Sequence, residues 1–504
     1  MKTSSLCVLW CAVVCITCAF AAQAQDTRTV TEPVIPPTCV TLKAEKTGEA
    51  EKLAEKFEKT TDTARIQQAL DSCRPGMAVE LAMGKNANAF LSGALELREG
   101  VTLLIDKSVV LYGSRDPKDF DPNPTDSTTK LLCGTMSNVS TAFITAQNAA
   151  KGNTPPAATP QGRPCKPLIS VNVKNAAIMG DGVIDGRGGA RVVGHDYSWW
   201  QMARAAEPKQ LRYYSTRLIV ASHADSFVIY GITLHNSPNF HVAVNNTDGF
   251  TVWGVHLQTP TVRGVDARNT DGIDPGSSTN ITITKSWIDN GDDNIAVKTG
   301  VTHMSVLDNH FYNGHGMSIG SDTYSGVSNL LVDGLTEDHT SSGIRIKSNQ
   351  ARGGLVHDLT YRNICMRNVQ MPIAISPFYN NGTLEGFVDP GIPGDRIPDY
   401  KNITLQNIFA STPGDVLIAG KDAAHVTEVR LDNVTIKDIK PEQVHTQFTR
   451  AVVSHVNFEL KGAGVVTTQA PPPSAGANTA YSGMDVLNPP TLLPQCTGQF
   501  QPMQ

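Results

Sequence analysis

Short apolar stretches alternate with polar residues through the middle of the chain, and Gly or Asn turns separate them. From Phe227 onward this pattern becomes a repeat of one alternating strand, a turn, a second short strand and a polar link. The repeat units begin 23 to 44 residues apart, at Phe227, Phe250, Ile281, Met304, Leu330, Leu359, Ile403 and Val429. Repeats of about 20–30 residues built from strands and turns predict an all-β fold, a right-handed single-stranded parallel β-helix.

Other repetitive architectures fit the pattern less well. A leucine-rich repeat has a similar period, but its regular Leu spacing is missing, and a propeller needs units of about 40 residues. An antiparallel sandwich also contains short strands and turns. The near-constant phase of the repeat favours the solenoid over the sandwich.

The segments outside the repeat have different signals. Residues 63–72 predict a short helix, capped by Asp62 and with Ile66, Ala69 and Leu70 on one face, that covers the N-terminal end of the solenoid. No repeat unit contains a convincing helix. Residues 25–37 are rich in Pro and Thr and are expected to be frayed. Residues 116–167 and 380–400 are predicted to be long loops.

The two ends of the chain bound the predicted domain. An apolar run from Leu6 to Phe20, followed by Ala22-Gln23-Ala24, is typical of a secretory signal peptide over residues 1–24. The run is too short for a membrane span. We therefore expect a secreted, extracellular and soluble protein with a β-helical domain at 25–461. Residues 462–504 are predicted to form a Pro-rich tail packed along the solenoid.

Charge and cysteine content narrow the function classes. The net charge of −5 argues against nucleic acid as a partner, and we expect a monomer without a membrane contact. Six cysteines follow the predicted signal peptide, which predicts disulfides in an exported protein. We favour the pairs Cys39–Cys73, Cys133–Cys165 and Cys365–Cys496, although fifteen pairings exist and Cys365 could instead be a free buried thiol.

Four polar segments interrupt the repeat within about 80 residues. They are Asn269-Thr270-Asp271-Gly272, Gly291-Asp292-Asp293-Asn294, Gly314-His315-Gly316-Met317-Ser318 and Arg345-Ile346-Lys347. Residues at equivalent positions in adjacent coils of a β-helix lie about 4.8 Å apart. The four segments recur at about the spacing of one coil, so we expect them to line one groove.

The phase of the repeat places individual side chains in that groove. Asp292 lies 11 residues after Ile281, and His315 lies 11 residues after Met304, so both are expected on one face of adjacent coils. Asp271 is expected one coil earlier. Arg345 and Lys347 are expected one coil later, on the same strand face as each other, and Tyr379 one coil beyond them.

This arrangement favours hydrolysis of an acidic sugar polymer. Asp271, Asp292 and Asp293 would form a cluster in which mutual repulsion raises one pKa. A protonated carboxyl beside ionised carboxylates suits glycoside hydrolysis. Arg345 and Lys347 suit binding of a substrate carboxylate, and Arg263, Arg268 and Lys298 could extend a cationic track.

Simpler interpretations exist for each segment alone. An Asp pair is common in solvated turns, and clustered Asp residues also bind calcium. His315 could be a polar turn residue, and Arg345-Ile346-Lys347 could be a solvated strand face. The arrangement of one polar segment per coil, in phase, favours a functional site.

The four segments also resemble, in order and spacing, the signature segments of the polygalacturonases of glycoside hydrolase family twenty-eight. The resemblance extends from about Thr63 to Ile439 and includes Gly182-Val183-Ile184-Asp185-Gly186 and Asn236-Ser237-Pro238. It implies a parallel β-helix and hydrolysis of the α-1,4-galacturonosyl bonds of polygalacturonate, with inversion and without a metal or other cofactor.

The resemblance also implies a role for each site residue. Asp292 is similar to the family's general acid, Asp271 and Asp293 to the pair that activates water, and His315 to its site histidine. Arg345 and Lys347 are similar to its galacturonate-binding cations, Tyr379 to its subsite tyrosine, and Asn269 to the first residue of its first motif.

Two features of the sequence depart from a simple match. Asn246-Thr247-Asp248-Gly249 repeats the first motif, but Asp248 lies 44 residues before Asp292, twice the expected gap, and is interpreted as structural. Asn294 stands where the family often has Cys, and this change is expected to remove a disulfide and leave the chemistry intact.

Several functions compete with endo-acting polygalacturonate hydrolysis. Exo-acting polygalacturonases and rhamnogalacturonan hydrolases resemble the same family, and a pectate lyase would share the fold but use calcium and β-elimination. A non-catalytic β-helical sugar-binding protein is the alternative from another class. The joint presence of Asp271, Asp292, Asp293 and His315 argues against that alternative.

Overall fold

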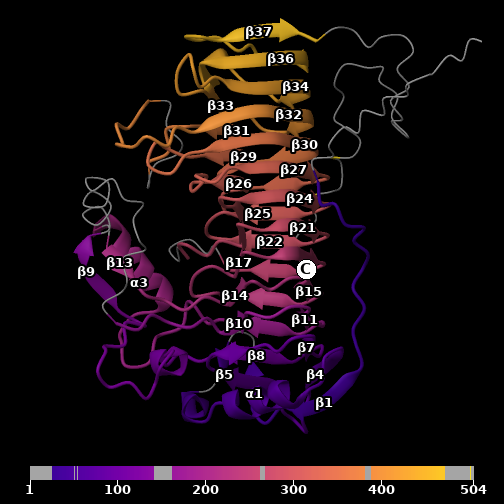
Figure 1. Ribbon diagram of the computed structural model, residues 1–504, viewed down its shortest axis with the longest axis vertical. Helices are drawn as coiled ribbons and strands as arrows, with labels where there is room; N and C mark the ends of the chain where they lie inside the picture. Colours follow the sequence, from indigo (N-terminus) through magenta and orange to yellow (C-terminus); the bar gives the residue numbers. More distant parts are fainter. Residues whose placement is uncertain are drawn as a thin grey trace, which may run out of the picture.

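Each turn of the chain supplies three short strands, and successive turns stack in parallel to form the predicted right-handed β-helix (Figure 1). The computed structural model describes residues 25–49, 52–53, 55–140, 162–209, 211–260, 267–380, 388–470, 496 and 500. The predicted signal peptide, the centre of the 116–167 loop, part of the 380–400 loop and most of the predicted tail lie outside these residues.

The first strands of the coils form one parallel ladder. They are β1 (Thr38–Lys43), β4 (Met77–Ala82), β7 (Val101–Ile105), β11 (Ala177–Met179), β15 (Val228–Tyr230), β18 (Asp248–Trp253), β21 (Thr279–Thr284), β24 (Val301–Leu307), β27 (Val327–Asp333), β30 (Leu355–Arg367), β32 (Asp399–Ala410), β34 (Thr427–Ile436), β36 (Thr449–Val456) and β37 (Val466–Gln469). The sheet thus continues past residue 461, where we placed the end of the solenoid, because β37 pairs with β36.

The second strands form a ladder that merges with the first. They are β5 (Ala89–Ser92), β8 (Val110–Gly113), β12 (Val183–Asp185), β16 (Thr233–His235), β19 (His256–Gln258), β22 (Trp287–Asn290), β25 (His310–Asn313) and β28 (Thr336–Asp338). The long strand β30 pairs with both β27 and β28, so the two ladders join in one 22-stranded sheet.

The third strands form a separate 11-stranded sheet. They are β6 (Leu95–Glu96), β10 (Ile169–Val171), β14 (Ile219–Ser222), β17 (Val242–Asn245), β20 (Ile273–Gly276), β23 (Ile295–Val297), β26 (Met317–Gly320), β29 (Ser342–Lys347), β31 (Met371–Ser376), β33 (Val416–Ala419) and β35 (Val444–Gln447). This sheet holds most of the polar residues singled out in the sequence.

The eight apolar positions that began the predicted repeat units stack on one another in the core. From Phe250 to Val429, each pairs directly with the next. The rings of Phe227 and Phe250 stack with their centroids 5.5 Å apart. All eight side chains are buried, so each coil buries apolar area against both neighbours. Burial of apolar area at about 25 cal/mol per Å² is the main stabilising contribution.

Two N-terminal segments differ from expectation in part. Helix α1 (Thr63–Ser72) lies at the end of the solenoid and buries Ile66, Ala69 and Leu70 as predicted. Asp62 is the N-cap residue of α1, as predicted, but its side chain makes no capping hydrogen bond. The Asp62 carboxylate instead accepts hydrogen bonds from Lys46 Nζ at 2.9 Å and from the backbone N–H of Leu91 at 2.7 Å, because it is buried beneath the helix and ties it to β5.

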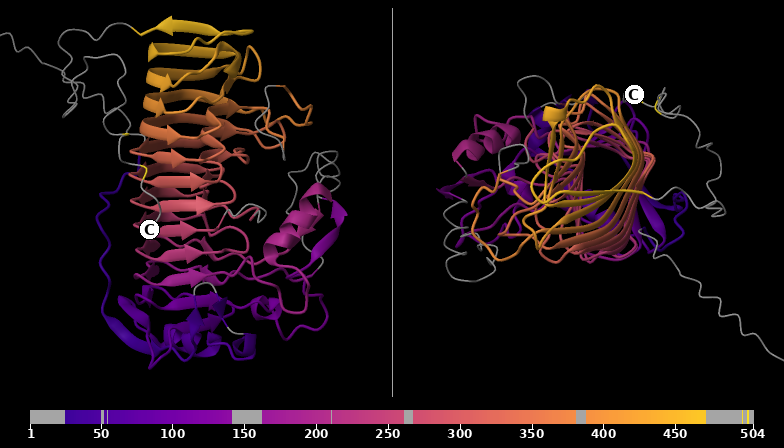
Figure 2. Two further views of the ribbon diagram at one scale, coloured as in Figure 1. Left: turned by 180° about the vertical axis from the view of Figure 1, so that it is seen from behind. Right: turned by 90° about the horizontal axis from the view of Figure 1, so that it is seen from above.

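The N-terminal strap, residues 25–37, is ordered, and the prediction that it is frayed was wrong. It runs along the outside of the large sheet (Figures 1 and 2). Asp26 anchors it: its carboxylate accepts a hydrogen bond from Thr282 Oγ1 at 2.7 Å, and its N–H donates to Ser305 Oγ at 3.0 Å. Further along, Tyr230 donates to Glu32 at 2.8 Å. The strap therefore crosses several coils.

All three predicted disulfides are present: Cys39–Cys73, Cys133–Cys165 and Cys365–Cys496. The alternative in which Cys365 is a free thiol was wrong. The third bond attaches residue 496 to β30, and the ring of Phe500 lies 4.5 Å from the Arg367 guanidinium. These two described residues of the predicted tail therefore contact the solenoid.

An arm projects from one side of the solenoid, and it contains a helix that the sequence analysis missed. The arm consists of β9 (Met136–Ser140), α3 (Trp199–Ala206) and β13 (Leu211–Tyr213), with β9 and β13 antiparallel (Figures 1 and 2). Ser198 and Gln201 form a capping box at the start of α3. The helix has eight residues, which is too short for a clear periodic signal.

The remaining elements are short. They are the antiparallel pair β2 (Gly48–Glu49) and β3 (Lys52–Leu53), and the 3₁₀ turns η1 (Glu55–Lys59), η2 (Pro117–Phe120), η3 (Glu207–Lys209) and η4 (Pro441–Gln443). No helix among the described residues is long and apolar enough to cross a membrane.

One buried carboxyl group interrupts an apolar column of the core. Glu337 of β28 follows, in register, Leu234, Leu257, Ile288 and Phe311, and it precedes Met366. Its side chain is fully buried and accepts the N–H of Met317 at 3.3 Å. Burial raises the pKa of Glu337 to about 8, so the folded protein holds it neutral at pH 7.

This carboxyl group makes stability depend on pH. The unfolded group ionises near its ordinary pKa of 4.5, whereas the folded group keeps its proton until about pH 8. Between these values the folded state binds more protons, so the unfolding free energy falls as pH rises. Glu337→Gln should remove on the order of 3 kcal/mol of that fall, measured by urea denaturation at pH 4.5 and pH 8.

The control for this prediction is Glu459→Gln, because Glu459 is an exposed glutamate paired with Lys461. It should retain the pH slope of the unmodified protein. An unchanged slope in Glu337→Gln would show that the buried group ionises normally in the folded state.

Candidate active site

Three of the predicted site residues lie at the same position in successive coils of the 11-stranded sheet. Ile273 pairs with Ile295, which pairs with Met317. Asp271, Asp293 and His315 each lie two residues before these strand positions. They therefore follow one another across β20, β23 and β26, at the spacing of parallel strands, about 4.8 Å.

The residue predicted to be in phase with His315 was the wrong member of the Asp pair. Asn290 pairs with Asn313, 23 residues on, whereas Ile295 pairs with Met317, 22 residues on. The turn before β26 is thus one residue shorter than the turn before β23, and this shift places Asp293 opposite His315. The N–H of His315 still donates to the Asp292 carbonyl at 2.9 Å.

Buried asparagines hold these turns together. Asn294 Oδ1 accepts the N–H of Gly316 at 2.8 Å, and its Nδ2 donates to Asn290 Oδ1 at 2.9 Å. Asn290 in turn donates to the Thr270 carbonyl at 2.8 Å. Gly316 is required because a Cβ there would lie 2.1 Å from the Ser342 carbonyl oxygen. Asn294, which stands where the resemblance implies Cys, therefore links the turns by hydrogen bonds.

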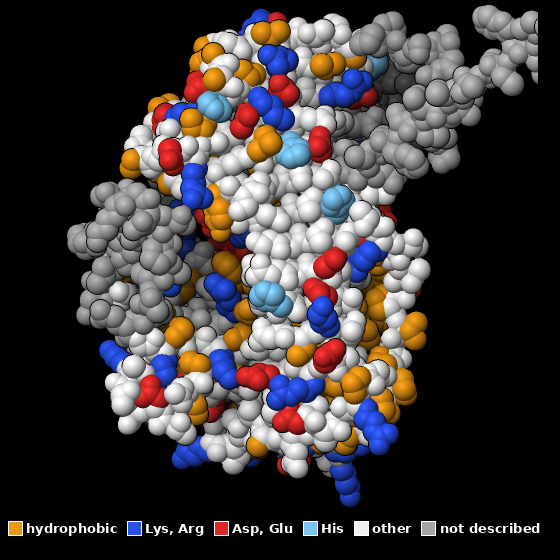
Figure 3. Space-filling model, viewed as in Figure 1, with side chains coloured by type: hydrophobic (Ala, Val, Ile, Leu, Met, Phe, Trp, Pro, Cys, Tyr) orange, Lys and Arg blue, Asp and Glu red, His pale blue; other side chains and the backbone are white. Residues whose placement is uncertain are grey.

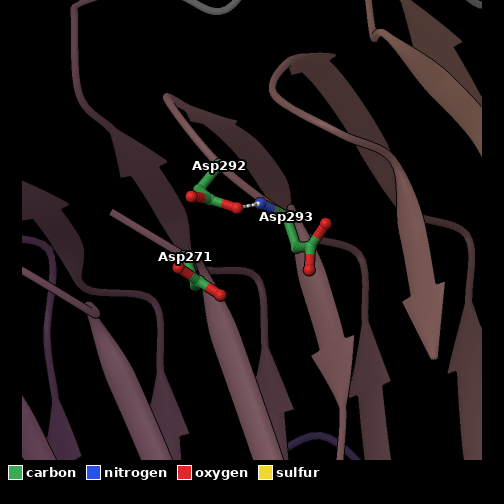
Figure 4. Close-up of side chains that lie close together, drawn as sticks. All are labelled: Asp271, Asp292 and Asp293. Carbon is green, nitrogen blue, oxygen red and sulfur yellow. Dashed lines mark hydrogen bonds between the residues drawn. The ribbon is translucent and has the colours of Figure 1, made fainter. Parts of the chain in front are cut away.

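The three predicted carboxylates converge (Figure 4). One oxygen from each of Asp271, Asp292 and Asp293 lies within 4.8 Å of the other two. Asp292 is half-buried, and its Oδ1 accepts the N–H of Asp293 at 2.9 Å. Its Oδ2 accepts the backbone N–H and the Nδ2 of Asn269, at 3.2 and 3.4 Å. Asn269 thus orients the most accessible carboxylate of the cluster.

Asp293 is held in its charged form by two cations from a strand two coils away. Its Oδ1 accepts a hydrogen bond from Arg345 at 2.6 Å, and its Oδ2 accepts one from Lys347 at 2.8 Å. Burial alone would raise the pKa of Asp293, but the charges of Lys347, Arg345 and Lys298 outweigh burial and hold the pKa well below its usual range. Asp293 is therefore ionised.

Asp271 is in the opposite electrostatic situation. Burial, together with the charges of Asp274 and Asp292, raises the pKa of Asp271 well above its usual value. Lys298 Nζ lies 3.7 Å from Asp271 and 3.4 Å from Asp274 and opposes the shift. Burial likewise raises the pKa of Asp274 to about 6. The cluster therefore combines a carboxyl group that favours its proton with one that does not.

The two predicted substrate-binding cations lie where the repeat phase placed them. Ser318 pairs with Arg345 and Gly320 with Lys347, one coil after His315. Tyr379 follows one coil later, with its ring centroid 5.3 Å from Lys347 Nζ. Both cations are buried, and burial lowers the pKa of Lys347. Arg345 and Lys347 already pair with Asp293. They therefore stabilise the charge of the cluster in addition to any role in binding a ligand.

Two histidines flank the cluster. His315 is half-buried, and its Nδ1 lies 2.6 Å from Ser341 Oγ. The sequence analysis did not single out His241, which is fully buried. Its Nδ1 lies 3.2 Å from the Thr270 and Asp271 carbonyl oxygens. Burial lowers the pKa of His241 to about 4, so the neutral ring supports the backbone of Asp271.

The two described residues of the proposed cationic track, Arg268 and Lys298, are both engaged in ion pairs. Arg268 forms an ion pair with Glu207 of the arm. Lys298 is engaged by Asp271 and Asp274. Arg263 lies outside the residues that the structure describes.

Asp248 lies apart from the cluster, as predicted, but for a different reason. It pairs with Thr279 on the 22-stranded sheet, whereas Asp271 precedes a strand of the other sheet. Its carboxylate accepts a hydrogen bond from Asn280 at 2.8 Å. The repeated Asn-Thr-Asp-Gly motif therefore occupies a different corner of the coil, where it has a structural role.

Asp274 and Tyr213 are the other site residues that the sequence analysis missed. Asp274 lies three residues after Asp271, just beyond the first motif, and that closeness was the available signal. Tyr213 comes from the arm, where no repeat exists. Its hydroxyl donates to Asn269 Oδ1 at 2.8 Å and accepts from Asn239 Nδ2 at 3.0 Å.

The carboxylate cluster has the donor set of a divalent-cation site, since three carboxylate oxygens converge. Both oxygens of Asp293 already accept hydrogen bonds from Arg345 and Lys347. A cation would have to compete with these buried charges, so the geometry fits a metal ion poorly.

Comparisons with known proteins identify the family of the chain. The family model described as Glycosyl hydrolases family 28 matches residues 126–454. The chain is 38% identical over 422 residues to an endo-polygalacturonase of Pectobacterium parmentieri. The matched region covers 82% of this chain and 91% of that protein.

Solved structures show the same relationship. A polygalacturonase from Erwinia carotovora ssp. carotovora superposes with a TM-score of 0.70 at 35% identity, covering 88% of this chain and 100% of that one. A family 28 exopolygalacturonase from Yersinia enterocolitica shares the fold, with a TM-score of 0.62 at 21% identity over 86% of this chain and 78% of that one. This chain therefore belongs to family 28 of the glycosyl hydrolases.

Proposed function

We propose that this chain is a secreted endo-polygalacturonase that hydrolyses the α-1,4-galacturonosyl bonds of polygalacturonate with inversion and without a metal. The observation that carries the proposal is the cluster of Asp271, Asp292 and Asp293, with the buried cations Arg345 and Lys347 beside it. The 38% identity of the chain to an endo-polygalacturonase supports this substrate and this mode of action.

The geometry supports a division of labour among the three carboxyl groups. Asp292 is the general acid, because it is the half-exposed member and Asn269 directs its Oδ2. Asp293 and Asp271 activate water from within the site. The lowered pKa of Asp293 keeps that group ionised as the base, whereas the raised pKa of Asp271 favours a proton on Asp271, which holds the water by hydrogen bonding.

Recognition of the acidic sugar falls to the residues around the carboxylates. Arg345 can bind a uronate carboxylate bidentately, Lys347 adds a second charge, and Tyr379 beside it offers an aromatic wall. His315 lies between these cations and Asp292. These positively charged groups suit galacturonate better than a neutral sugar.

The broader setting is also part of the proposal. Three disulfides suit an oxidising compartment, which agrees with removal of residues 1–24 on export. Residues 25–461 would then form most of the catalytic domain of a monomer, with the remainder as a tail.

The activity itself is the first test. The mature protein should release reducing ends from polygalacturonate in the presence of EDTA, because protein side chains supply both acid and base. Solution viscosity should fall early, since an endo-acting enzyme cuts within chains. Unsaturated products, detected by their ultraviolet absorbance, or dependence on added calcium would instead indicate a lyase.

The second test removes the proposed acid. Asp292→Asn should lower kcat by about 10²–10⁴-fold, the usual contribution of general acid catalysis, while circular dichroism stays unchanged. Asp248→Asn is a matched control because it alters the same motif residue on the other sheet. Equal losses in both variants would contradict the assignment.

The third test concerns the stereochemistry of hydrolysis. Inverting enzymes usually hold their two carboxyl groups about 6.5–9.5 Å apart, and retaining enzymes about 5–5.5 Å. The nearest oxygens of the cluster lie within 4.8 Å of one another, which is closer to the shorter range, whereas the proposed activation of water by Asp271 and Asp293 predicts inversion. NMR of the first products should show inverted anomers. Retained anomers would indicate a covalent intermediate on Asp293 or Asp271.

A further inference from the structure

A pocket lies beside the carboxylate cluster, between the arm and the solenoid. Its volume is about 510 Å³, within the usual range for small-molecule sites. The arm lines it with Arg212, Tyr213 and Tyr214, and the solenoid lines it with Arg217, Val220, Asn239, Phe240 and Asn269. The space-filling view shows a hollow in this face of the molecule, with acidic side chains deep inside it and basic ones around it (Figure 3).

The charge of this pocket is opposite to that of the chain. The whole sequence has a net charge of −5, but the described lining contains two arginines and no carboxylate. A local excess of positive charge in a concave site attracts anions even when the protein as a whole is acidic. The pocket therefore favours an anionic occupant.

Arg217 is the cation best prepared for such an occupant. Its guanidinium lies 4.7 Å from the ring centroid of Phe240, and its Nε donates to Asn239 Oδ1 at 3.4 Å. The aromatic contact and the hydrogen bond restrain the side chain. Among the described residues, no carboxylate forms an ion pair with Arg217, although the guanidinium is exposed.

The strand register connects Arg217 to the reacting groups. Ile219 pairs with Val242, which pairs with Ile273, so Arg217, Phe240 and Asp271 occupy equivalent positions two residues earlier. Two coil spacings, roughly 10 Å, separate Arg217 from Asp271.

The pocket is also continuous with the cluster. Asn269 lines the pocket and donates hydrogen bonds to Asp292, and Tyr213 of the arm donates to Asn269. A polymer that reacts at Asp292 can therefore extend over Asn269 and into the pocket.

We propose that this pocket is a subsite for a second uronate unit of the substrate, and that Arg217 binds the carboxylate of that unit. The proposal rests on the proposed function for the identity of the sugar. It assigns to the arm one wall of the subsite, through Tyr213 and Tyr214, and to the solenoid the charge that selects the acidic sugar.

The test separates binding from hydrolysis. In the full-length mature chain carrying Asp292→Asn, calorimetry with hexagalacturonate should show a Kd about tenfold higher when Arg217→Gln is added, because a charge-assisted hydrogen-bonded pair is lost. Arg217→Lys should give an intermediate Kd, since it keeps the charge and loses the planar fork. Arg430→Gln, at an exposed arginine of β34, is the matched control and should leave the Kd within twofold.

In the active background, Arg217→Gln should raise KM for polygalacturonate about tenfold and leave kcat within twofold, because Arg217 does not touch the reacting atoms. An unchanged Kd, or an equal weakening by Arg430→Gln, would overturn the subsite. If the unmodified enzyme fails to hydrolyse polygalacturonate, the proposed function fails, while the calorimetric comparison still decides whether Arg217 binds the uronate.

Discussion

The stacking distance of the coils is the constraint on which the site depends. Parallel strands hold equivalent residues about 4.8 Å apart, and the core columns from Phe227 to Val429 prevent any coil from slipping. A slip of one residue would turn every buried apolar side chain outward. The rigid core therefore forces Asp271 and Asp293 close together even though like charges repel.

Cations from coils further along the chain offset that repulsion. Lys298 comes one coil after Asp274, and Arg345 and Lys347 come two coils after Asp293. The pairs of Arg345 and Lys347 with Asp293 are buried, where removal of one partner would leave an uncompensated charge at a cost of about 3–5 kcal/mol. The same cations fix how the cluster is protonated, because they lower the pKa of Asp293 more effectively than that of Asp271. Structure and chemistry thus depend on one set of ion pairs.

The features that could be predicted from the sequence are those whose position follows from the repeat. One apolar residue per coil was enough to find the core columns, and the phase of the repeat brought Asp271, His315, Arg345 and Lys347 to one sheet. It was less accurate within turns, because the turn before β26 is one residue shorter than its counterpart and shifts the partner of His315 to Asp293.

Features outside the repeat could not be predicted from the periodicity of the sequence. Helix α3 is short, and Tyr213 lies in an insertion whose path no periodicity describes. The strap at residues 25–37 looked frayed because its anchoring contacts, such as that between Asp26 and Thr282, join positions 256 residues apart. Glu337 could have been noticed, since it is a charged residue in a column that is otherwise apolar.

The solenoid and its insertion therefore make different contributions to the site. The coils alone bring the carboxylates and their cations together. Asn290 and Asn294 connect the turns that carry the carboxylates by hydrogen bonds. Tyr213 of the arm accepts a hydrogen bond from Asn239 of the solenoid and donates one to Asn269, which in turn donates to Asp292. Because Tyr213 donates to Asn269 Oδ1, the Nδ2 of that amide is directed to Asp292. The insertion thus orients the proposed acid and walls the adjoining pocket, which links the position of the substrate to the geometry of proton transfer.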